Sequence, residues 1–278
     1  MFAVAVYACA EGRRQVFAWC VRTGELVFRN SMNSSSKFVP RVAVVAGVGS
    51  GLGASLARRF AHEGCRVALL ARSADYLDQL AAEINTARGP GTALALPCDL
   101  ASPEQIVATF GRIRAELGPT DLLVNNASGG GGPRGAGLLQ LEPIDFERAW
   151  RIGVYGALLC SREAARDMLM AGRNGGAIFF SGATSSVRGA GIAFSSAKFA
   201  SRGLAQALAR ELWPRGVHVA HVIVDGMIAD PTDGPADGQE PLMDPESIAS
   251  TYWQLALQER SAWTLELDLR PDREKFFE

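Results

Sequence analysis

The sequence predicts an α/β fold of the doubly wound Rossmann type, with a parallel sheet and helices on both faces. Short apolar runs rich in Val, Ile and Leu alternate with helical patterns from residue 41 onward, as is typical of strands buried on both faces. A glycine-rich turn joins the first run to the first helical pattern. With 278 residues, 48% of them hydrophobic, the chain can bury a sizeable core. Ligands of such sheets bind at the carboxyl ends of the strands, so functional side chains are expected there.

The elements follow one another as this fold requires. The expected strands are RVAVVA (41–46), RVALLA (66–71), TALALPCD (92–99), DLLVNNA (121–127), GAIFFSG (176–182) and VHVAHVIVDG (217–226), with SAWTLELDLRP (261–271) as a plausible last strand. Helical patterns occupy residues 53–64, 74–87, 103–118, 145–172 and 190–216. A segment rich in proline and glycine around 227–250 is expected to form a substrate lid, which leads into a helix carrying Tyr252 and Trp253.

Residues 1–40 differ from the Rossmann-type domain expected over 41–278. Two short β-type runs and the turn signals Glu11-Gly12 and Thr23-Gly24 indicate a small β meander, followed by a linker-like stretch. Met32 would also be a sensible start for the domain. A structured N-terminal extension and a start-site artefact are therefore both open interpretations.

Composition and charge exclude several function classes. The formal net charge is −1 and no basic face is present, so neither nucleic acid nor an anionic membrane is expected as a partner. The longest apolar runs have the length of strands, which is too short to span a bilayer. The 5 cysteines are scattered without C-x-x-C spacing, which favours a reduced, cytoplasmic protein without structural zinc. His218 and His221 lack a further histidine nearby, so no metal site is expected.

The glycine-rich turn is the first candidate binding site. Gly47, Gly51 and Gly53 fit a G-x-x-x-G-x-G spacing, and Gly49, Gly51 and Ala54 fit G-x-G-x-x-A. In either register, backbone without side chains would let a pyrophosphate approach the N-terminus of the helix, with Ser50 and Leu52 in the same turn. The alternative is a tight turn that binds no ligand.

The next strand indicates which dinucleotide this turn would bind. A cofactor without a 2′-phosphate usually meets a carboxylate at the end of this strand, but here Arg72 and Ser73 follow it. A guanidinium and a hydroxyl suit a 2′-phosphate by charge and hydrogen bonding. The sequence thus favours NADP over NAD, the alternative being a solvated Arg72 at a helix cap.

Three short motifs, AGVGSGLG (46–53), CDL (98–100) and NNAS (125–128), resemble those of the short-chain dehydrogenase/reductase family, over roughly residues 41–226. The resemblance implies that the Asp99-Leu100 pair lies at the adenine, that Asn125 lines the cofactor ribose, that Ala127 also binds the cofactor, and that Gly226 lies beside the nicotinamide.

The same resemblance exposes an altered catalytic set, because the family works with an asparagine, a serine, a tyrosine and a lysine. Lys198 matches the lysine, while Phe194, Ala183 and Gly153 stand where the tyrosine, serine and asparagine are expected. Phe194 and Lys198 are four residues apart and share one helix face. A lysine in this apolar helix needs a partner when buried, and ribose hydroxyls would provide it.

Other groups could replace the missing proton donor. Ser181, Thr184 or Ser185 could supply a hydroxyl at the end of the fifth strand, and Asp225 could act as an acid or a base or merely cap its loop. Tyr155 is a weaker candidate, because two residues along a helix place it about 200° away from Gly153.

The resulting hypothesis is an NADP-dependent oxidoreductase that acts on a small carbonyl or alcohol with a non-standard proton donor. A non-catalytic NADP(H)-binding pseudoenzyme or scaffold and a non-redox enzyme on the same fold are the alternatives. The last strand lacks the family's usual glycine-rich ending, which often helps to form a tetramer interface. Whether the chain forms a homo-oligomer is therefore left open.

Overall fold

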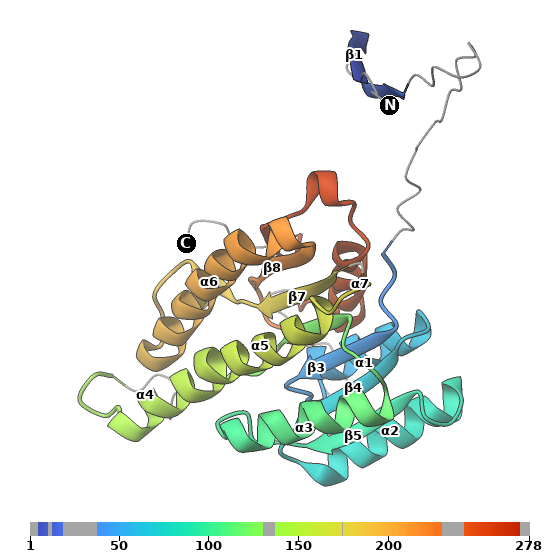
Figure 1. The fold of residues 1–278 in the computed structure, drawn as a ribbon. Coiled ribbons are helices and arrows are strands. Elements are labelled where there is room, and N and C mark those ends of the chain that lie inside the picture. Colours follow the sequence, from blue (N-terminus) through green and yellow to red (C-terminus); the bar gives the residue numbers. More distant parts are fainter. Residues whose placement is uncertain are drawn as a thin grey trace. The chain divides into compact units, whose positions relative to one another are not determined.

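The computed structural model describes residues 5–10, 13–18, 38–129, 137–173, 175–229 and 242–272, and the chain divides into the units Met1–Lys37 and Phe38–Glu278 (Figure 1). In the first unit, β1 (Ala5–Ala10) pairs antiparallel with β2 (Arg13–Ala18). The expected turns at Glu11-Gly12 and Thr23-Gly24, and the linker, lie outside the described residues.

The second unit is built on a parallel sheet of seven strands. Their order is β5-β4-β3-β6-β7-β8-β9, and every neighbouring pair is parallel. The strands are β3 (Val42–Ala46), β4 (Arg66–Ala71), β5 (Ala93–Pro97), β6 (Leu122–Asn125), β7 (Gly176–Ser181), β8 (Val217–Val224) and β9 (Glu266–Leu269). Each corresponds to one of the predicted apolar runs, and the predicted fold class is confirmed.

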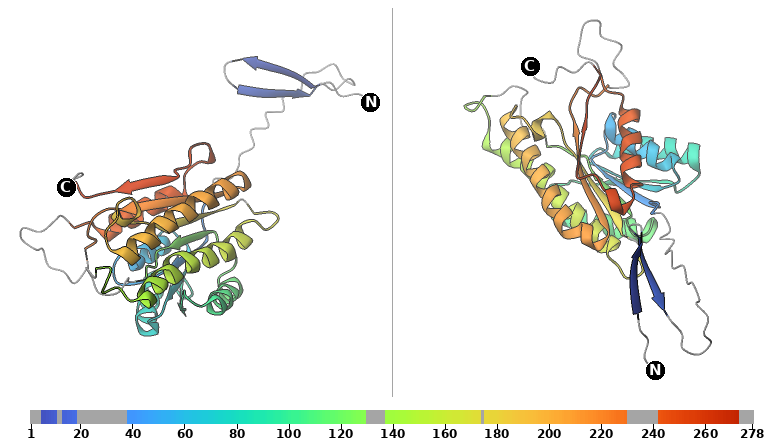
Figure 2. Two further views of the ribbon diagram at one scale, coloured as in Figure 1. Left: turned by 90° about the vertical axis from the view of Figure 1, so that its left-hand side faces the viewer. Right: turned by 90° about the horizontal axis from the view of Figure 1, so that it is seen from above.

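Helices cover both faces of the sheet, as Figure 2 shows with the sheet seen edge-on. One face packs against α1 (Leu52–His62), α2 (Ala74–Arg88) and α7 (Pro245–Ala256). The other packs against α3 (Pro103–Glu116), α5 (Ala157–Met168) and α6 (Ile192–Leu212). Alternate residues of β3 enter the two cores, Ala43 and Val45 on one side and Val44 and Ala46 on the other. This two-sided burial explains why the strands are continuous apolar runs.

The long helix expected over 145–172 differs from a regular α-helix. The structure divides it into α4 (Pro143–Trp150), a π-helical turn η1 (Arg151–Gly156) and α5. Glycines at 153 and 156 weaken the preference for regular helix in this turn. Gly156 also lies against Leu100, whose carbonyl oxygen would be 2.3 Å from a Cβ atom at position 156. The close contact brings η1 against the segment that follows β5.

The sheet has a topological switch point between β3 and β6. From β3 the chain first builds β4 and β5 on one side, and from β6 onward it builds the other side. The loops after β3 and β6 therefore diverge, and a crevice opens at their carboxyl ends.

The expected lid is described only at its two ends. Ile228 and Met243 form a parallel β-bridge, and residues 230–241 lie outside the described residues. Asp244 caps α7 by accepting hydrogen bonds from two backbone N–H groups, and Tyr252 and Trp253 of this helix are buried. The role of residues 227–250 as a lid stays a prediction.

Asp121 connects the amino ends of the central strands. Its buried carboxylate accepts hydrogen bonds from the backbone N–H groups of Arg41, at 2.8 Å, and Val42, at 3.0 Å. The Arg173 guanidinium, in the loop before β7, pairs with the same carboxylate. One side chain thus joins the starts of β3, β6 and β7.

Replacing Asp121 by Ala should lower the free energy of unfolding by about 3 kcal/mol, because two backbone donors and a guanidinium lose their shared acceptor. Urea denaturation followed by circular dichroism measures the change. The control is Asp78→Ala on the exposed side of α2, where a change below about 0.5 kcal/mol is expected. Equal losses in the two variants would contradict this role of Asp121.

Candidate functional site

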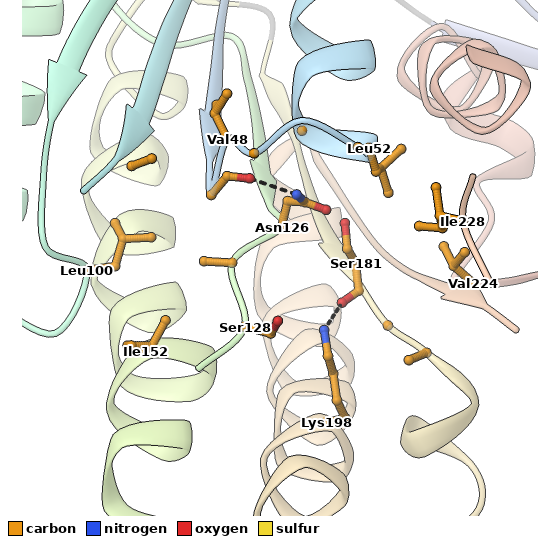
Figure 3. A pocket seen from close by; sticks show the side chains of 18 of the residues that line it. Val48, Leu52, Leu100, Asn126, Ser128, Ile152, Ser181, Lys198, Val224 and Ile228 are labelled. Atoms are coloured by element: carbon orange, nitrogen blue, oxygen red, sulfur yellow. Dashed lines mark hydrogen bonds between the residues drawn. The ribbon is translucent and has the colours of Figure 1, made fainter. Parts of the chain in front are cut away.

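A pocket of about 520 Å³ lies at the carboxyl ends of the strands, where the switch point opens the sheet (Figure 3). Many of the residues predicted to bind a cofactor line it, namely Gly47, Gly49, Gly51, Leu52, Gly53, Arg72, Asp99, Leu100, Ala127, Lys198 and Gly226. Ser50, Ser73 and Asn125, which were predicted with them, do not line it. The pocket also includes residues that sequence reasoning did not single out as binding residues, among them Val48, Asn126, Ser128, Ile152 and Ile228.

The glycine turn between β3 and α1 leaves no room for side chains on its inner side. Gly47 has φ +107°, which favours glycine, and a Cβ atom there would lie 2.3 Å from the backbone nitrogen of Ala127. A Cβ atom at Gly53 would lie 2.6 Å from the Gly47 carbonyl oxygen. These contacts pack the start of α1 tightly against β3 and the loop after β6.

On its outer side the same turn is open toward the pocket. Cβ atoms at Gly49 and Gly51 would meet nothing within 4 Å, and both residues line the pocket. Gly51 is the N-cap of α1 and makes no side-chain capping bond, and no acidic residue occupies the first turn. Free N–H groups and the positive end of the helix dipole favour an anion. This turn fits the phosphates of a dinucleotide.

Asn126 holds the turn from the neighbouring strand. Its Nδ2 atom donates a hydrogen bond of 2.7 Å to the Gly47 carbonyl oxygen, drawn as a dashed line in Figure 3. Asn125 instead is buried, and its Nδ2 atom donates to the Ser161 hydroxyl of α5 at 3.0 Å. Successive side chains of a strand point to opposite faces of the sheet. This alternation could have indicated from the sequence that Asn125 and Asn126 have different surroundings.

The far end of the pocket has the features expected around an adenosine. Arg72 follows β4, is exposed and lines the pocket, and Asp99 and Leu100 line it after β5. Ser73 is the exposed N-cap of α2. At the end of β4 the pocket therefore presents a guanidinium and no carboxylate.

Lys198 lies at the other end of the pocket. The residue is 8% exposed, and its Nζ atom donates a hydrogen bond of 2.7 Å to the carbonyl oxygen of Ser181 at the end of β7 (Figure 3). The Phe194 ring, one turn earlier on α6, has its centroid 5.5 Å from Nζ and lines the same pocket. Burial lowers the pKa of Lys198 to about 8. The amine can therefore gain or lose a proton near neutral pH.

The hydroxyl groups considered as proton donors have other partners or lie elsewhere. The Ser181 hydroxyl is 2.8 Å from the Tyr252 hydroxyl of α7, and burial raises the pKa of Tyr252. Thr184, in the 3₁₀ turn η2 (Thr184–Ser186), donates to Asp225. Ser185 is buried in the same turn and does not line the pocket. Tyr155 is 42% exposed on η1.

Asp225 forms a charged cluster rather than a wall of the pocket. The residue is 2% exposed, and its carboxylate pairs with Arg188 at 3.1 Å and Arg270 at 2.6 Å besides accepting from Thr184. The two arginines and the threonine come from the loops after β7 and β9. A cluster of this kind joins three strand ends and compensates the buried charge.

Two features of other functional classes can be stated for the described part of the chain. None of its helices combines the length and apolar composition needed to cross a membrane. Within the same ranges, no group of three or more His, Cys, Asp or Glu side chains is arranged to hold a metal ion.

The chain is similar to known proteins over most of its length. A family model described as short chain dehydrogenase matches residues 41–237. Human dehydrogenase/reductase SDR family member 11 is 30% identical over 220 residues, which are 77% of this chain and 82% of that protein. A metagenomic short-chain oxidoreductase solved with NADP has a TM-score of 0.71 at 29% identity, covering 83% of this chain and 97% of its own. A 3-ketoacyl-(acyl-carrier-protein) reductase from Brucella melitensis, solved with NADH, has a TM-score of 0.70 at 25% identity, covering 82% and 96%. The chain belongs to the short-chain dehydrogenase family.

Proposed function

We propose that the protein is an NADP(H)-dependent oxidoreductase that acts on a small carbonyl or alcohol with a non-standard proton donor. The observation that carries this proposal is one pocket that contains an open glycine turn at one end and a buried, titratable Lys198 at the other. The turn suits phosphates, and the lysine suits the ribose hydroxyls and the reacting oxygen. When bound, the dinucleotide supplies or accepts the hydride.

The preference for NADP(H) depends on Arg72. One related structure contains NADP and another contains NADH, so the similarity to these proteins does not indicate which of the two cofactors this protein prefers. An exposed guanidinium beside the end of β4 can form charge-assisted hydrogen bonds with a 2′-phosphate. A ribose without that phosphate would find no carboxylate there to accept from its hydroxyls.

The non-standard part of the proposal concerns Phe194. Its place one helical turn before Lys198, with both side chains at the pocket, supports assigning it to the position of the family's catalytic tyrosine. A phenyl ring packs beside the substrate but provides no proton. Gly153 and Ala183, assigned to the asparagine and serine positions, provide none either.

Lys198 is then the proton donor that the pocket favours. Asp225 is paired with two arginines and does not line the pocket, and Thr184 donates to that carboxylate. The Lys198 ammonium lines the pocket, and its lowered pKa of about 8 suits proton transfer near neutral pH. It would bind a cofactor hydroxyl, orient the substrate oxygen and release a proton to that oxygen.

A non-catalytic NADP(H)-binding protein is the second candidate. The apolar groups at positions 153, 183 and 194 favour it, because three proton-handling positions carry no ionisable or hydroxyl group. The two candidates agree on cofactor binding and differ in turnover. Mixing the protein with NADPH and a panel of aldehydes, ketones and enones separates them, because binding without oxidation of NADPH across the panel would exclude the oxidoreductase.

Arg72→Ala should weaken NADPH binding about 10–100-fold while leaving NADH binding nearly unchanged, because charge-assisted hydrogen bonds to the 2′-phosphate are lost. Fluorescence titration with each nucleotide gives the two dissociation constants. The control variant is Arg112→Ala, which removes an exposed arginine of α3 paired with Glu116. An NADPH preference that survives in Arg72→Ala would overturn the assignment of Arg72.

Phe194→Tyr should raise NADPH-dependent reduction by about 10²–10⁴-fold, because a phenol close to Lys198 adds a general acid at the reacting oxygen. Initial rates on the carbonyl panel measure the gain. Phe199→Tyr provides a matched control on the same helix, since Phe199 is 43% exposed and does not line the pocket. If Phe194→Tyr binds NADPH yet reduces no substrate, the pocket does not align substrate and cofactor.

A further inference from the structure

A surface groove lies along the C-terminal half of α6, away from the candidate active site. Its volume is about 270 Å³, and it is lined by Gln206, Ala209, Arg210, Trp213, Pro214 and Leu265. None of these residues lines the large pocket. Arg210 comes 12 residues after Lys198, which is about 18 Å along the helix axis at ~1.5 Å per residue. We call this cavity the α6 groove.

The spacing of residues along the chain explains the wall that α6 contributes. Positions 206, 209, 210, 213 and 214 follow one another at helical intervals, so they share one face of α6 and of the 3₁₀ turn η3 (Trp213–Arg215) that continues it. Leu265, just before β9, adds an aliphatic side chain that is 38% exposed. With Ala209 and Pro214, this leucine makes much of the lining apolar.

The indole of Trp213 is held in one orientation at the groove. Its Nε1 atom donates a hydrogen bond of 3.0 Å to the Val219 carbonyl oxygen of β8. Its ring meets Trp263 edge to face, with 5.9 Å between centroids, and His218 at 6.1 Å. The latter two rings stack on each other at 4.8 Å. Because the indole is already ordered, a ligand that packs on it would lose little additional side-chain entropy.

Arg210 brings an uncompensated positive charge to this apolar lining. The side chain is exposed, and no carboxylate of the described residues pairs with it. The positions three and four residues before and after it on the helix hold no acidic residue, so the usual helical ion pair is missing. Arg215 differs in this respect, because Glu211 lies four positions earlier and 3.7 Å away. The guanidinium of Arg210 is therefore available to an anion from outside.

The carboxylate of Glu266, which contacts the groove residue Gln206, is already neutralised. Arg202 forms a two-pronged ion pair with it, at 2.5 Å and 2.8 Å, and the Gln206 Nε2 atom donates to it at 3.2 Å. These hydrogen bonds lower the pKa of Glu266, so the pair stays ionised at neutral pH. A further cation, Arg260, lies over the Trp263 ring at 5.6 Å from its centroid. The excess charge around the groove is therefore positive.

We propose that the α6 groove binds a small amphiphilic carboxylate, whose charged group pairs with Arg210 and whose apolar body packs on Trp213, Pro214 and Leu265. One guanidinium matches the single charge and the planar geometry of a carboxylate. A volume of about 270 Å³ is the share of about nine water molecules at ~30 Å³ each, so a ligand of about ten non-hydrogen atoms fits. The site is distinct from the candidate active site and does not depend on the proposed function.

Phenylacetate is a suitable probe, and Trp213 reports its binding directly. The chain contains 5 tryptophans, so labelling them with ¹⁵N in the indole gives one NMR signal for each Nε1–H group, and Trp213→Phe identifies the signal of Trp213. Titration without any nucleotide should shift this signal with a dissociation constant of about 1 mM, as expected for a ligand of this size. Trp150 is the internal control, because it is 38% exposed on α4 and does not line the groove.

Two matched comparisons separate the charge from the apolar body of the ligand. The alcohol 2-phenylethanol keeps the ring and lacks the charge, acetate keeps the charge and lacks the ring, and each should bind about tenfold more weakly than phenylacetate. Arg210→Ala should weaken phenylacetate binding about tenfold or more, because the charge-assisted hydrogen bonds are lost. Arg215→Ala removes the same charge one turn away and outside the groove, and an unchanged dissociation constant is expected. Both arginines are exposed, so the two variants should fold normally.

Three results would overturn the site. The first is the absence of a Trp213 shift at about twenty times the expected dissociation constant. The second is an equal loss of affinity in Arg210→Ala and Arg215→Ala, or equal affinities for phenylacetate and 2-phenylethanol, since either would show binding without recognition of the carboxylate by Arg210. The third is a change of sedimentation coefficient in Arg210→Ala without any binding of phenylacetate, which would assign the groove to contact with a second copy of the chain.

Discussion

The structure of this protein depends on the contact between two backbone segments at the switch point of the sheet. Gly47 after β3 and Ala127 after β6 approach so closely that a Cβ atom at Gly47 would be 2.3 Å from the Ala127 nitrogen, and Asn126 bonds to the Gly47 carbonyl oxygen. The contact holds the loops after β3 and β6 together at their base and lets them diverge above it. The position of the pocket, the separation of its two ends and the accessible N-terminus of α1 all follow from this geometry.

The two ends of the pocket have different chemical characters. Around the glycine turn the backbone supplies the donors, so side chains can vary while the phosphate-binding geometry persists. At the Lys198 end a reaction would require side-chain groups, but the polar side chains near this end form hydrogen bonds and ion pairs with other parts of the fold. Ser181 pairs with Tyr252, and Thr184 pairs with Asp225, which two arginines neutralise. The presence of a polar residue near a strand end is therefore not enough to predict a catalytic role, because its hydrogen-bond and ion-pair partners determine whether it is available to a substrate.

A buried lysine without a nearby carboxylate partner is costly for a folded protein. Lys198 has a carbonyl oxygen at 2.7 Å and an aromatic ring beside it, which compensate part of that cost and leave the amine easy to deprotonate. The small residues between η1 and α6 leave space behind it. A small cavity lined by Gly153 and Ala197 therefore borders this titratable group.

The sequence by itself determined the sheet, the glycine turn and the helix that carries Lys198, because these depend on local periodicity and on glycine's freedom at Gly47. It also determined that Phe194 and Lys198 share a helix face. Only the tertiary structure decided that Asn126 rather than Asn125 reaches the large pocket and that Asp225 is paired with Arg188 and Arg270. Those arginines are 37 and 45 residues away in the chain, and no local pattern encodes which strand ends become neighbours. The small cavity beside Lys198 is likewise a property of packing, since Ala149 and Ala197, which line it, come from two helices that pack against each other.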